Sequence, residues 1–252
     1  MKKSINKEKI KNAFTQSFIS YDEESYAQRT IINHLLNALI RTQGSCFPYV
    51  LEIGCGTGLL TRELCRLFHP IKFVVNDLCD VFFNSLWEDS VIFVPGDAEQ
   101  LNFDGKYDLI ISSSTIQWFE DIESFLRKIE KNLSENGIIA ISTFGSDNLK
   151  EIKTLTNRGL SYYSFERWIS IISEIFDMIT ISQEFVPLFF ETPIEVLKHL
   201  KKTGVNGLNE NPLSPSQVVS FCKDYKKQYM SENGLILTYH PIYIIARKKR
   251  RI

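Results

Sequence analysis

The sequence predicts an α/β fold, in which a seven-stranded and mostly parallel sheet carries helices on both faces. The first observation is an apolar, β-branched run over residues 49–53, which suits a buried parallel strand and ends in three alternating glycines. Leucines then follow at helical spacing, so the local order is strand, tight turn and helix. Finally, residues 191–234 separate the last two expected strands by more than a hairpin requires, which predicts an inserted helical cap.

Apolar periodicity assigns the remaining elements within one domain over residues 1–252. N-terminal helices are expected over the ligand site in 1–45, the core sheet in 46–190 and 235–252, and the cap in 191–234. The expected strands are 49–53, 71–75, 91–94, 107–111, 138–144, 178–190 and 235–246. Helices are expected at 7–20, 23–41, 81–87, 122–133 (ended by Asn136-Gly137), 163–176, 193–203 and 216–230.

The glycine turn predicts a site for an amino-acid moiety. Gly54, Gly56 and Gly58 are spaced Gly-x-Gly-x-Gly, unlike the G-x-G-x-x-G of dinucleotide sites. Glu52, at the end of the preceding strand, would repel a pyrophosphate but would suit an ammonium group, while the turn's N–H groups could meet a carboxylate. Asp77 closes the next strand, where an acid typically binds a ribose hydroxyl pair. An ordinary glycine turn is the alternative reading.

Taken whole, this pattern resembles the class I S-adenosylmethionine-dependent methyltransferases, which have a Rossmann-like fold. The resemblance implies S-adenosylmethionine as cofactor, S-adenosylhomocysteine as product and no metal. It also implies that Asp97 accepts from the adenine amine and that the Ala98 N–H serves a ring nitrogen; a helix cap is the alternative for Asp97. The implied cofactor-binding residues are Tyr21, Gln28, Glu52, Gly54, Gly56, Gly58, Asn76, Asp77, Leu78, Asp97, Ala98 and Ser113.

Longer stretches of sequence resemble one particular family within this class of methyltransferases. The similar runs are F-x-x-x-F-x-x-Y-D at 14–22 followed by Ala27 and Gln28, Q-W-F at 117–119, and the runs 196–206 and 237–241. The family resembled is the malonyl-[acyl-carrier protein] O-methyltransferases of biotin synthesis. Ser114 departs from the family, whose members often carry Asn there. The implied acceptor pocket comprises Tyr21, Gln117, Trp118, His199, Lys201, Lys202, Tyr239 and His240. For the aromatic residues a core role, for the lysines a solvated face and for the histidines a structural role remain alternatives.

The resemblance implies methylation of the free carboxylate of a malonyl thioester on acyl-carrier protein, with malonyl-coenzyme A as a further possible substrate. A carboxylate is ionised at neutral pH, so no general base is assigned, and no Ser/His/Asp or Cys/His constellation is evident. Residues from 195 onward hold 11 Lys and Arg against 4 Asp and Glu, which suits an acidic carrier. Lys198, Lys201 and Lys202 are expected to meet the carrier or its phosphate. An arginine is expected at the malonyl carboxylate; the candidates are Arg127, Arg158 and Arg167.

Composition predicts a cytoplasmic monomer. The five cysteines are odd in number and lack C-x-x-C pairs, which favours reduced thiols over disulfides or zinc. No apolar run is long enough for a transmembrane helix, and the basic N-terminus lacks the apolar segment of a signal peptide. Neither nucleic acid nor membrane is expected as a partner.

Three other functions remain open. A quinone or phenol methyltransferase of the same fold would want a catalytic base and a less basic cap. A nucleic-acid-binding module could use the basic run 247–251, although no recognition motif accompanies it. A cofactor-binding regulatory or interaction protein would lack turnover.

Overall fold

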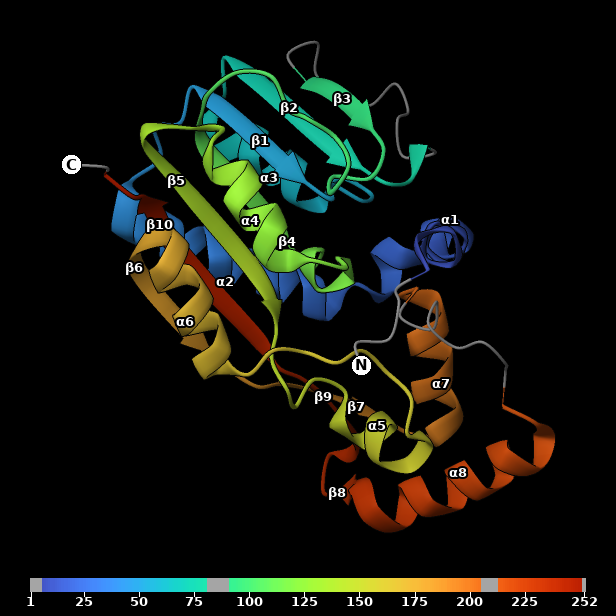
Figure 1. The fold of residues 1–252 in the computed structure, drawn as a ribbon. Helices are drawn as coiled ribbons and strands as arrows, with labels where there is room; N and C mark the ends of the chain where they lie inside the picture. Colours follow the sequence, from blue (N-terminus) through green and yellow to red (C-terminus); the bar gives the residue numbers. More distant parts are fainter. Residues whose placement is uncertain (1–5, 81–90, 205–212, 251–252) are drawn as a thin grey trace.

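A computed structural model describes residues 6–80, 91–204 and 213–250, and within α1 it leaves the side chains of residues 18–24 undescribed. Seven strands form the main sheet in the order β3-β2-β1-β4-β5-β10-β6 (Figure 1). Only β10 runs antiparallel to its neighbours, which confirms the expected mostly parallel sheet. Its strands are β1 (Tyr49–Ile53), β2 (Lys72–Asp77), β3 (Val91–Pro95), β4 (Tyr107–Ser113), β5 (Leu133–Phe144), β6 (Phe176–Gln183) and β10 (Pro241–Lys248).

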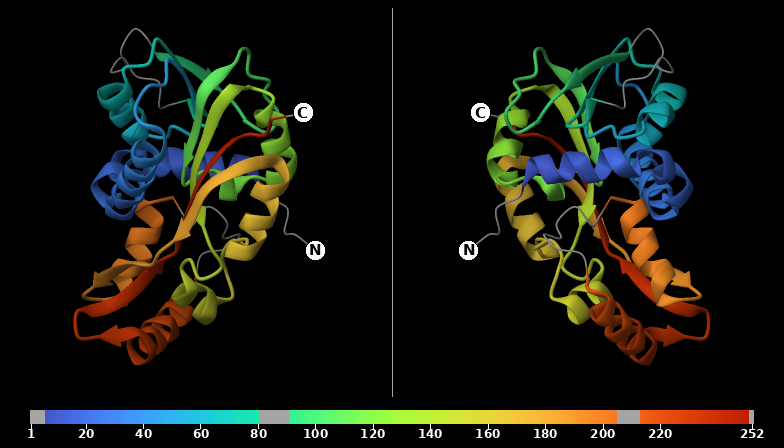
Figure 2. Two further views of the ribbon diagram at one scale, coloured as in Figure 1. Left: turned by 90° about the vertical axis from the view of Figure 1, so that its left-hand side faces the viewer. Right: turned by 90° about the vertical axis from the view of Figure 1, so that its right-hand side faces the viewer.

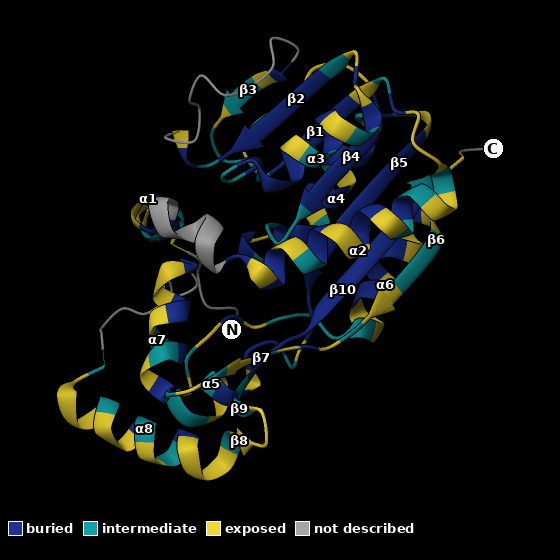
Figure 3. Ribbon diagram, turned by 180° about the vertical axis from the view of Figure 1, so that it is seen from behind, coloured by how far each residue is buried: buried dark blue, intermediate teal, exposed yellow. Residues whose placement is uncertain are grey.

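Helices cover both faces of this sheet because successive strand residues point to opposite sides. On one face α2 (Tyr26–Gln43) and α3 (Leu59–Phe68) pack on strand residues such as Val50 and Leu109. On the other face α4 (Ile122–Glu130) and α6 (Phe165–Ile175) pack on the alternate residues, such as Leu51 and Ile110. The inner strands β1, β2, β4, β5 and β10 are buried along most of their length, whereas the edge strands β3 and β6 are not (Figure 3).

The N-terminal helices differ from the prediction at their junction. α1 spans Lys7–Glu24 and α2 begins at Tyr26, so Tyr21 and Asp22 lie inside α1 rather than in a linker. No glycine or proline interrupts residues 7–24, and the Asn6 side chain caps the start by accepting from the Lys9 N–H. The chain therefore continues the first helix until Ser25, which is fully buried at the junction.

The prediction of two long final strands was wrong. The run 178–190 is divided between β6 and β7 (Val186–Phe190), and the run 235–246 between β9 (Gly234–Tyr239) and β10. β7 and β9, with β8 (Met230–Ser231), form a second sheet in the order β7-β9-β8. The polar residues at the corners, Gln183-Glu184 and His240, interrupt each run only briefly, and similar polar residues also occur inside strands.

Two further boundaries were missed. The helix expected over 122–133 ends at Glu130, and Leu133 already begins β5, so Asn136-Gly137 lies within a strand. A Cβ on Gly137 would lie 2.8 Å from the Tyr107 carbonyl oxygen, so this glycine permits close strand approach instead of ending a helix.

α5 (Lys150–Thr156) was not expected. The helix expected at 81–87 lies outside the described residues.

The cap helices α7 (Pro193–Lys202) and α8 (Pro215–Tyr229) confirm the expected helices at 193–203 and 216–230. Each begins with a proline and a capping box, set by Thr192 and Ser214, which satisfies N–H groups of the first turn. α7 contacts β7, α8 contacts β9 and α5, and α1 contacts α7. Both views of Figure 2 place the small sheet with α7 and α8 at the end of the molecule away from β3.

The basic run near the C-terminus is partly structural. Arg247 and Lys248 belong to β10; the first donates to Gln43 Oε1 at 3.1 Å and the second to the Leu133 carbonyl at 2.8 Å. Lys249 donates to the carbonyls of Ser173 and Glu174. These charges therefore do not form a wholly solvated tail. Among the described helices, none combines the length and apolar character needed to cross a bilayer.

His240 fixes the corner between β9 and β10. Its Nδ1 accepts from the Asp147 N–H at 3.2 Å, so its Nε2 carries the proton and donates to Gln183 Oε1 at 2.9 Å. Its ring stacks on Phe185 with centroids 4.5 Å apart. A Cβ on Gly145 would lie 2.6 Å from the ring, so only glycine fits there. His240 thus joins three segments at the passage from one sheet to the other.

We predict that His240 makes the protein less stable in mild acid. Burial lowers its pKa, outweighing the Asp147 carboxylate, which raises it. Because the folded pKa lies below the unfolded value of about 6.5, this contribution to stability is present above that pH. It is lost as the pH falls below about 6.5 toward the folded pKa. Melting temperatures measured from pH 5 to 8 should fall more steeply in the wild type than in His240→Gln.

The matched control is His69→Asn, at an exposed helix end. It should keep the wild-type slope. Equal slopes for wild type and His240→Gln would contradict the assignment.

Candidate functional site

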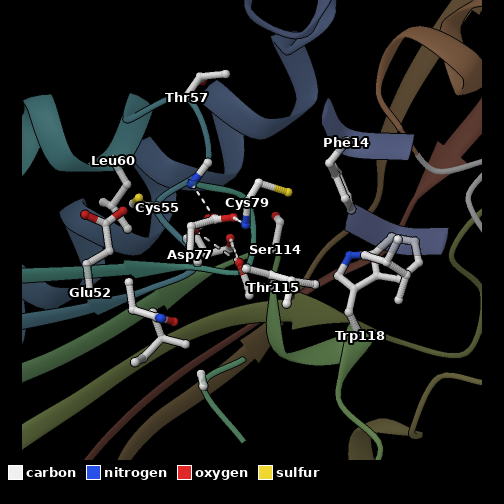
Figure 4. A pocket seen from close by; sticks show the side chains of 18 of the residues that line it. Phe14, Glu52, Cys55, Thr57, Leu60, Asp77, Cys79, Ser114, Thr115 and Trp118 are labelled. Carbon is white, nitrogen blue, oxygen red and sulfur yellow. Dashed lines mark hydrogen bonds between the residues drawn. The ribbon is translucent and has the colours of Figure 1, made fainter. Parts of the chain in front are cut away.

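A pocket opens where β1, β2, β3 and β4 end, between these strand ends and the N-terminal helices (Figure 4). It lies at the carboxyl edge of the parallel strands, where ligands of open α/β sheets bind. Side chains of α1 and α2 complete its wall. The predicted site residues that line it are Gln28, Glu52, Gly54, Gly56, Asn76, Asp77, Leu78, Asp97, Ala98, Ser113 and Trp118.

The glycine turn follows β1 with left-handed backbone angles. The φ angles of Gly54, Gly56 and Gly58 are 75°, 52° and 82°, which favour glycine. A Cβ on Gly54 would lie 2.2 Å from the Thr115 side chain, so this position has no room for another residue. An added Cβ on Gly56 would meet nothing within 4 Å, and that side of the turn is open to a ligand.

The turn's N–H groups are largely used inside the protein. Gly54 and Cys55 donate to the Asn76 carbonyl at 2.8 and 2.9 Å, Gly56 donates to Asp77 Oδ2 at 2.8 Å, and Gly58 donates to the Cys55 carbonyl. The expectation that these groups hold a ligand carboxylate is therefore wrong for these four donors. Because glycines have no side chains, a ligand can come close to the backbone of this turn.

Glu52 and Gln28 present buried acceptors that the protein leaves unsatisfied. Glu52 is 1% exposed; its Oε2 accepts from the Thr61 hydroxyl at 2.7 Å, and its Oε1 has no hydrogen-bond partner among the described residues. The same is true of Gln28 Oε1. Burial raises the pKa of Glu52 to about 8. Because an unsatisfied buried acceptor is costly, both atoms fit a ligand that brings donors, as an α-ammonium group does.

Asp77 and Asn76 connect the ends of β1, β2 and β3. Asp77 Oδ1 accepts from the Cys79 N–H at 2.8 Å, and burial raises the pKa of this carboxyl. Its remaining lone pairs can accept from a ribose hydroxyl pair. The Asn76 amide donates to the carbonyls of Val94 and Gly96 at 2.8 and 3.0 Å. Asn76 lines the pocket, but its amide holds the turn after β3.

The turn after β3 carries Asp97 and Ala98. Asp97 Oδ1 accepts from the Glu99 N–H at 3.0 Å and lies 3.2 Å from Lys7 Nζ, while its main-chain carbonyl accepts from residues 100 and 101. Asp97 thus caps a turn and also faces the pocket. Lys7 was not expected here, since a lysine on an amphipathic helix is typical of a solvated face.

An aromatic wall closes the side of the pocket nearest the cap. Phe14 of α1 meets Trp118 edge to face, with ring centroids 5.5 Å apart, and both line the pocket (Figure 4). Leu160, on the loop between α5 and α6, forms a small hydrophobic cluster with Trp118 and Ile10. Ser114 also lines the pocket; its φ is 54°, and its buried Oγ has no partner among the described residues. Sequence reasoning left Ser114 in doubt, and the structure places it at the site.

Most of the expected acceptor residues do not line this pocket. Gln117 donates to the Ser114 carbonyl at 2.6 Å, and His199 Nε2 lies 2.9 Å from the buried Tyr239 hydroxyl. His240 lies at the strand corner, and Lys201 and Lys202 are exposed on α7. The side chain of Tyr21 lies outside the described part of the chain. Of the predicted acceptor residues, only Trp118 is among those described as lining the pocket.

Two of the three candidate arginines have surface partners. Arg127 pairs with Glu174, and Arg167 pairs with Glu123. Both pairs join α4 to α6, on the outer side of that helical layer. Arg158 instead lies on the loop between α5 and α6 that also carries Leu160. Among the described residues, no cluster of His, Cys, Asp or Glu could hold a metal ion.

Comparison with known proteins agrees with this site. The family "Methyltransferase domain" matches residues 51–141, which include the glycine turn, Asp77 and Asp97. A malonyl-[acyl-carrier protein] O-methyltransferase of Bacteroides thetaiotaomicron is 39% identical over 98% of this chain and 100% of the relative. One of Bacteroides fragilis is 40% identical over 95% of this chain, which spans 50% of that longer relative.

A solved structure supports the fold. The N-methyltransferase NodS of Bradyrhizobium japonicum, in complex with S-adenosyl-L-homocysteine, has a TM-score of 0.53 at 14% identity and covers 93% of this chain and 99% of its own. The strand order, the glycine turn and the paired acids define a class I, S-adenosylmethionine-dependent methyltransferase. The near full-length identity is more specific: the chain belongs to the malonyl-[acyl-carrier protein] O-methyltransferase family.

Glu52 should make cofactor affinity depend on pH. In the free protein its pKa is about 8. Below that pH the carboxyl must lose a proton before it can pair with the ammonium group of the ligand. Calorimetry with S-adenosylhomocysteine should therefore show affinity rising from pH 6 to about 8.

Glu52→Gln should weaken binding about tenfold or more and remove the acid limb of this profile. Glu63→Gln, on the outer side of α3 where it pairs with Arg66, is the control and should behave as wild type. A Glu52→Gln profile parallel to that of the wild type would show that Glu52 does not hold the ammonium.

Proposed function

We propose that this chain transfers the methyl group of S-adenosylmethionine to the free carboxylate of a malonyl thioester on acyl-carrier protein. The identity to the Bacteroides thetaiotaomicron enzyme across both full lengths carries the proposal. Methylation cancels the carboxylate charge, so that the half-ester can serve as a primer for chain elongation toward biotin. We further propose a cytoplasmic monomer that favours the carrier-bound substrate over malonyl-coenzyme A.

The chain's own residues supply binding and orientation. When bound, S-adenosylmethionine supplies an electrophilic sulfonium methyl carbon. Glu52 Oε1 takes the ammonium group of the cofactor's amino-acid part, and Asp77 takes its ribose hydroxyls. The open side of Gly56 lets the cofactor come close to the protein backbone. Phe14 and Trp118 exclude water from the side where an acceptor must enter in line with the methyl.

Proton transfer is not needed for this reaction, because the nucleophile is already ionised. The two histidines of the expected acceptor set support this reading: His199 Nε2 pairs with Tyr239, and both His240 ring nitrogens have partners. Neither is placed to act as a general base in the pocket. This favours a carboxylate acceptor over the quinone or phenol that a related methyltransferase would have to deprotonate.

The substrate carboxylate and the carrier need cationic partners. Arg158 is our candidate for the carboxylate, because Leu160 on its loop belongs to the same hydrophobic cluster as Trp118, which lines the pocket. Lys198, Lys201 and Lys202 are exposed on α7, which contacts α1 beside the pocket. We propose that they meet the acidic carrier or the phosphate of its prosthetic arm.

The test of the proposal is methyl transfer from labelled S-adenosylmethionine. Malonyl-carrier protein, malonyl-coenzyme A, free malonate and the unloaded carrier should be compared. We expect base-labile label on the malonyl thioesters, strongest on the carrier form. No transfer to any of them, with cofactor still bound, would contradict the proposed acceptor.

Reversing the charge of the α7 lysines tests the docking surface. Lys198→Glu, Lys201→Glu and Lys202→Glu together should raise KM for malonyl-carrier protein about tenfold at low salt, because the attraction becomes repulsion. The kcat and the Kd for S-adenosylhomocysteine should not change. Lys106→Glu with Lys131→Glu is the control, since these exposed lysines flank the opposite edge of the sheet. An unchanged KM in the α7 variant would remove α7 from the docking surface.

A further inference from the structure

Lys7 is the one cation among the described residues that line the pocket. It shares a face of α1 with Ile10 and Phe14, three and seven residues further on, and all three line the pocket. This face of α1 has Lys7 near its start and Phe14 two turns later. Both residues line the pocket beside the strand ends that carry the glycine turn and Asp77. Lys7 has no role in the reaction described above.

The Lys7 ammonium bridges two carboxylates of the loop after β3. Nζ lies 3.2 Å from Asp97 Oδ1 and 2.6 Å from Glu99 Oε2, and 4.7 Å from the centroid of the Phe119 ring. The side chains of Lys7 and Glu99 are 22% and 9% exposed. Being shielded from water, such a charge cluster couples more strongly than an exposed surface pair.

The same helix offers an exposed pair for comparison. Lys11, one turn further along α1, pairs with Asp80 at 3.1 Å, and their side chains are 39% and 63% exposed. Lys11 does not line the pocket. The two lysines therefore separate an interaction at the pocket from an ordinary surface ion pair of α1.

Glu99 connects Lys7 to the opposite wall of the pocket. Its carboxylate accepts from the N–H groups of Glu120 and Asp121 at 3.0 and 2.8 Å, directly after Trp118 and Phe119. Phe14, on the same face of α1 as Lys7, packs on Trp118. α1 is thus attached to this wall twice, by charge near its start and by aromatic contact two turns later.

We propose that Lys7 is a positioning residue for the cofactor, which holds α1 across the Asp97 end of the pocket and so retains the bound ligand. Without this cation, the Asp97 and Glu99 carboxylates lose the ammonium that bridges them, and the start of α1 loses its attachment. Ligand then leaves faster through the opened side. This inference rests on the proposed function only for the identity of the cofactor.

The test is binding of S-adenosylhomocysteine, measured by calorimetry, in wild type, Lys7→Met, Lys7→Arg and Lys11→Met. Lys7→Met should raise the Kd about fivefold to tenfold, since it removes a shielded charge contact at the pocket. Lys7→Arg, which keeps the charge, should restore most of the affinity, and Lys11→Met should stay within about twofold of wild type. In Glu99→Gln, a further Lys7→Met change should cost less than it does in the wild type, because the two residues act together.

Hydrogen exchange adds a readout that folding alone does not move. Bound S-adenosylhomocysteine should slow amide exchange in residues 8–17 of wild type and Lys11→Met but not of Lys7→Met. Equal Kd values for Lys7→Met and Lys11→Met, or full protection of α1 in Lys7→Met, would overturn the inference. Failure of the wild type to bind S-adenosylhomocysteine would overturn it together with the cofactor assignment. A protein that binds this ligand in a Lys7-dependent way but methylates no malonyl thioester would support the inference and refute only the acceptor.

Discussion

The site depends on the hydrogen bonds that tie the end of β1 to the end of β2. The Asn76 carbonyl accepts from Gly54 and Cys55, and Asp77 accepts from Gly56, so the glycine turn is held mainly by the neighbouring strand. This arrangement requires left-handed angles that only glycine adopts at little cost. It fixes the open side of Gly56 relative to Glu52 and Asp77, and the ligand-binding groups then follow from the parallel register of the two strands.

The buried oxygen Oε1 of Glu52 is the feature of the pocket that indicates most directly which ligand group binds there. Glu52 loses solvation and has no ion-pair partner among the residues that the structure describes, and its raised pKa reflects that cost. A cationic ligand group removes the cost by supplying the missing charge. The same carboxyl therefore weakens the free protein and strengthens the complex, which is how a site gains affinity for an ammonium group without additional contacts.

How much the sequence could predict depended on how local each feature is. The turn, Glu52, Asp77 and Asp97 were predictable because residue type and position at a strand end determine their surroundings. His199 and His240 lie away from the pocket because their partners are distant in the sequence, whereas Gln117 is turned toward the carbonyl of the nearby Ser114. Lys7 was missed because a lysine on a helix carries no signal of what lies opposite it, although its spacing with Ile10 and Phe14 marks one face.

The division of the last strands between two sheets escaped prediction for another reason. Short polar interruptions, Gln183-Glu184 and His240, stand at the two corners, but the sequence does not distinguish them from polar positions inside a strand. What forms the second corner is the His240 ring, which has hydrogen-bond partners on two segments and packs against Gly145. Such a junction is a tertiary property of three chain segments.

This junction also decides which segments can be exchanged between related enzymes to make a chimaera. The segments β6–β7 and β9–β10 run from the main sheet into the cap sheet, so the cap is not a separate insertion with two free ends but a continuation of β10 and the edge strand β6. A chimaera that grafts a different acceptor-binding cap would have to carry both corners and the loop beginning at Gly145 as one unit. Joining the chains inside α7 and α8 alone would leave the orientation of the new cap to strands selected for the old one.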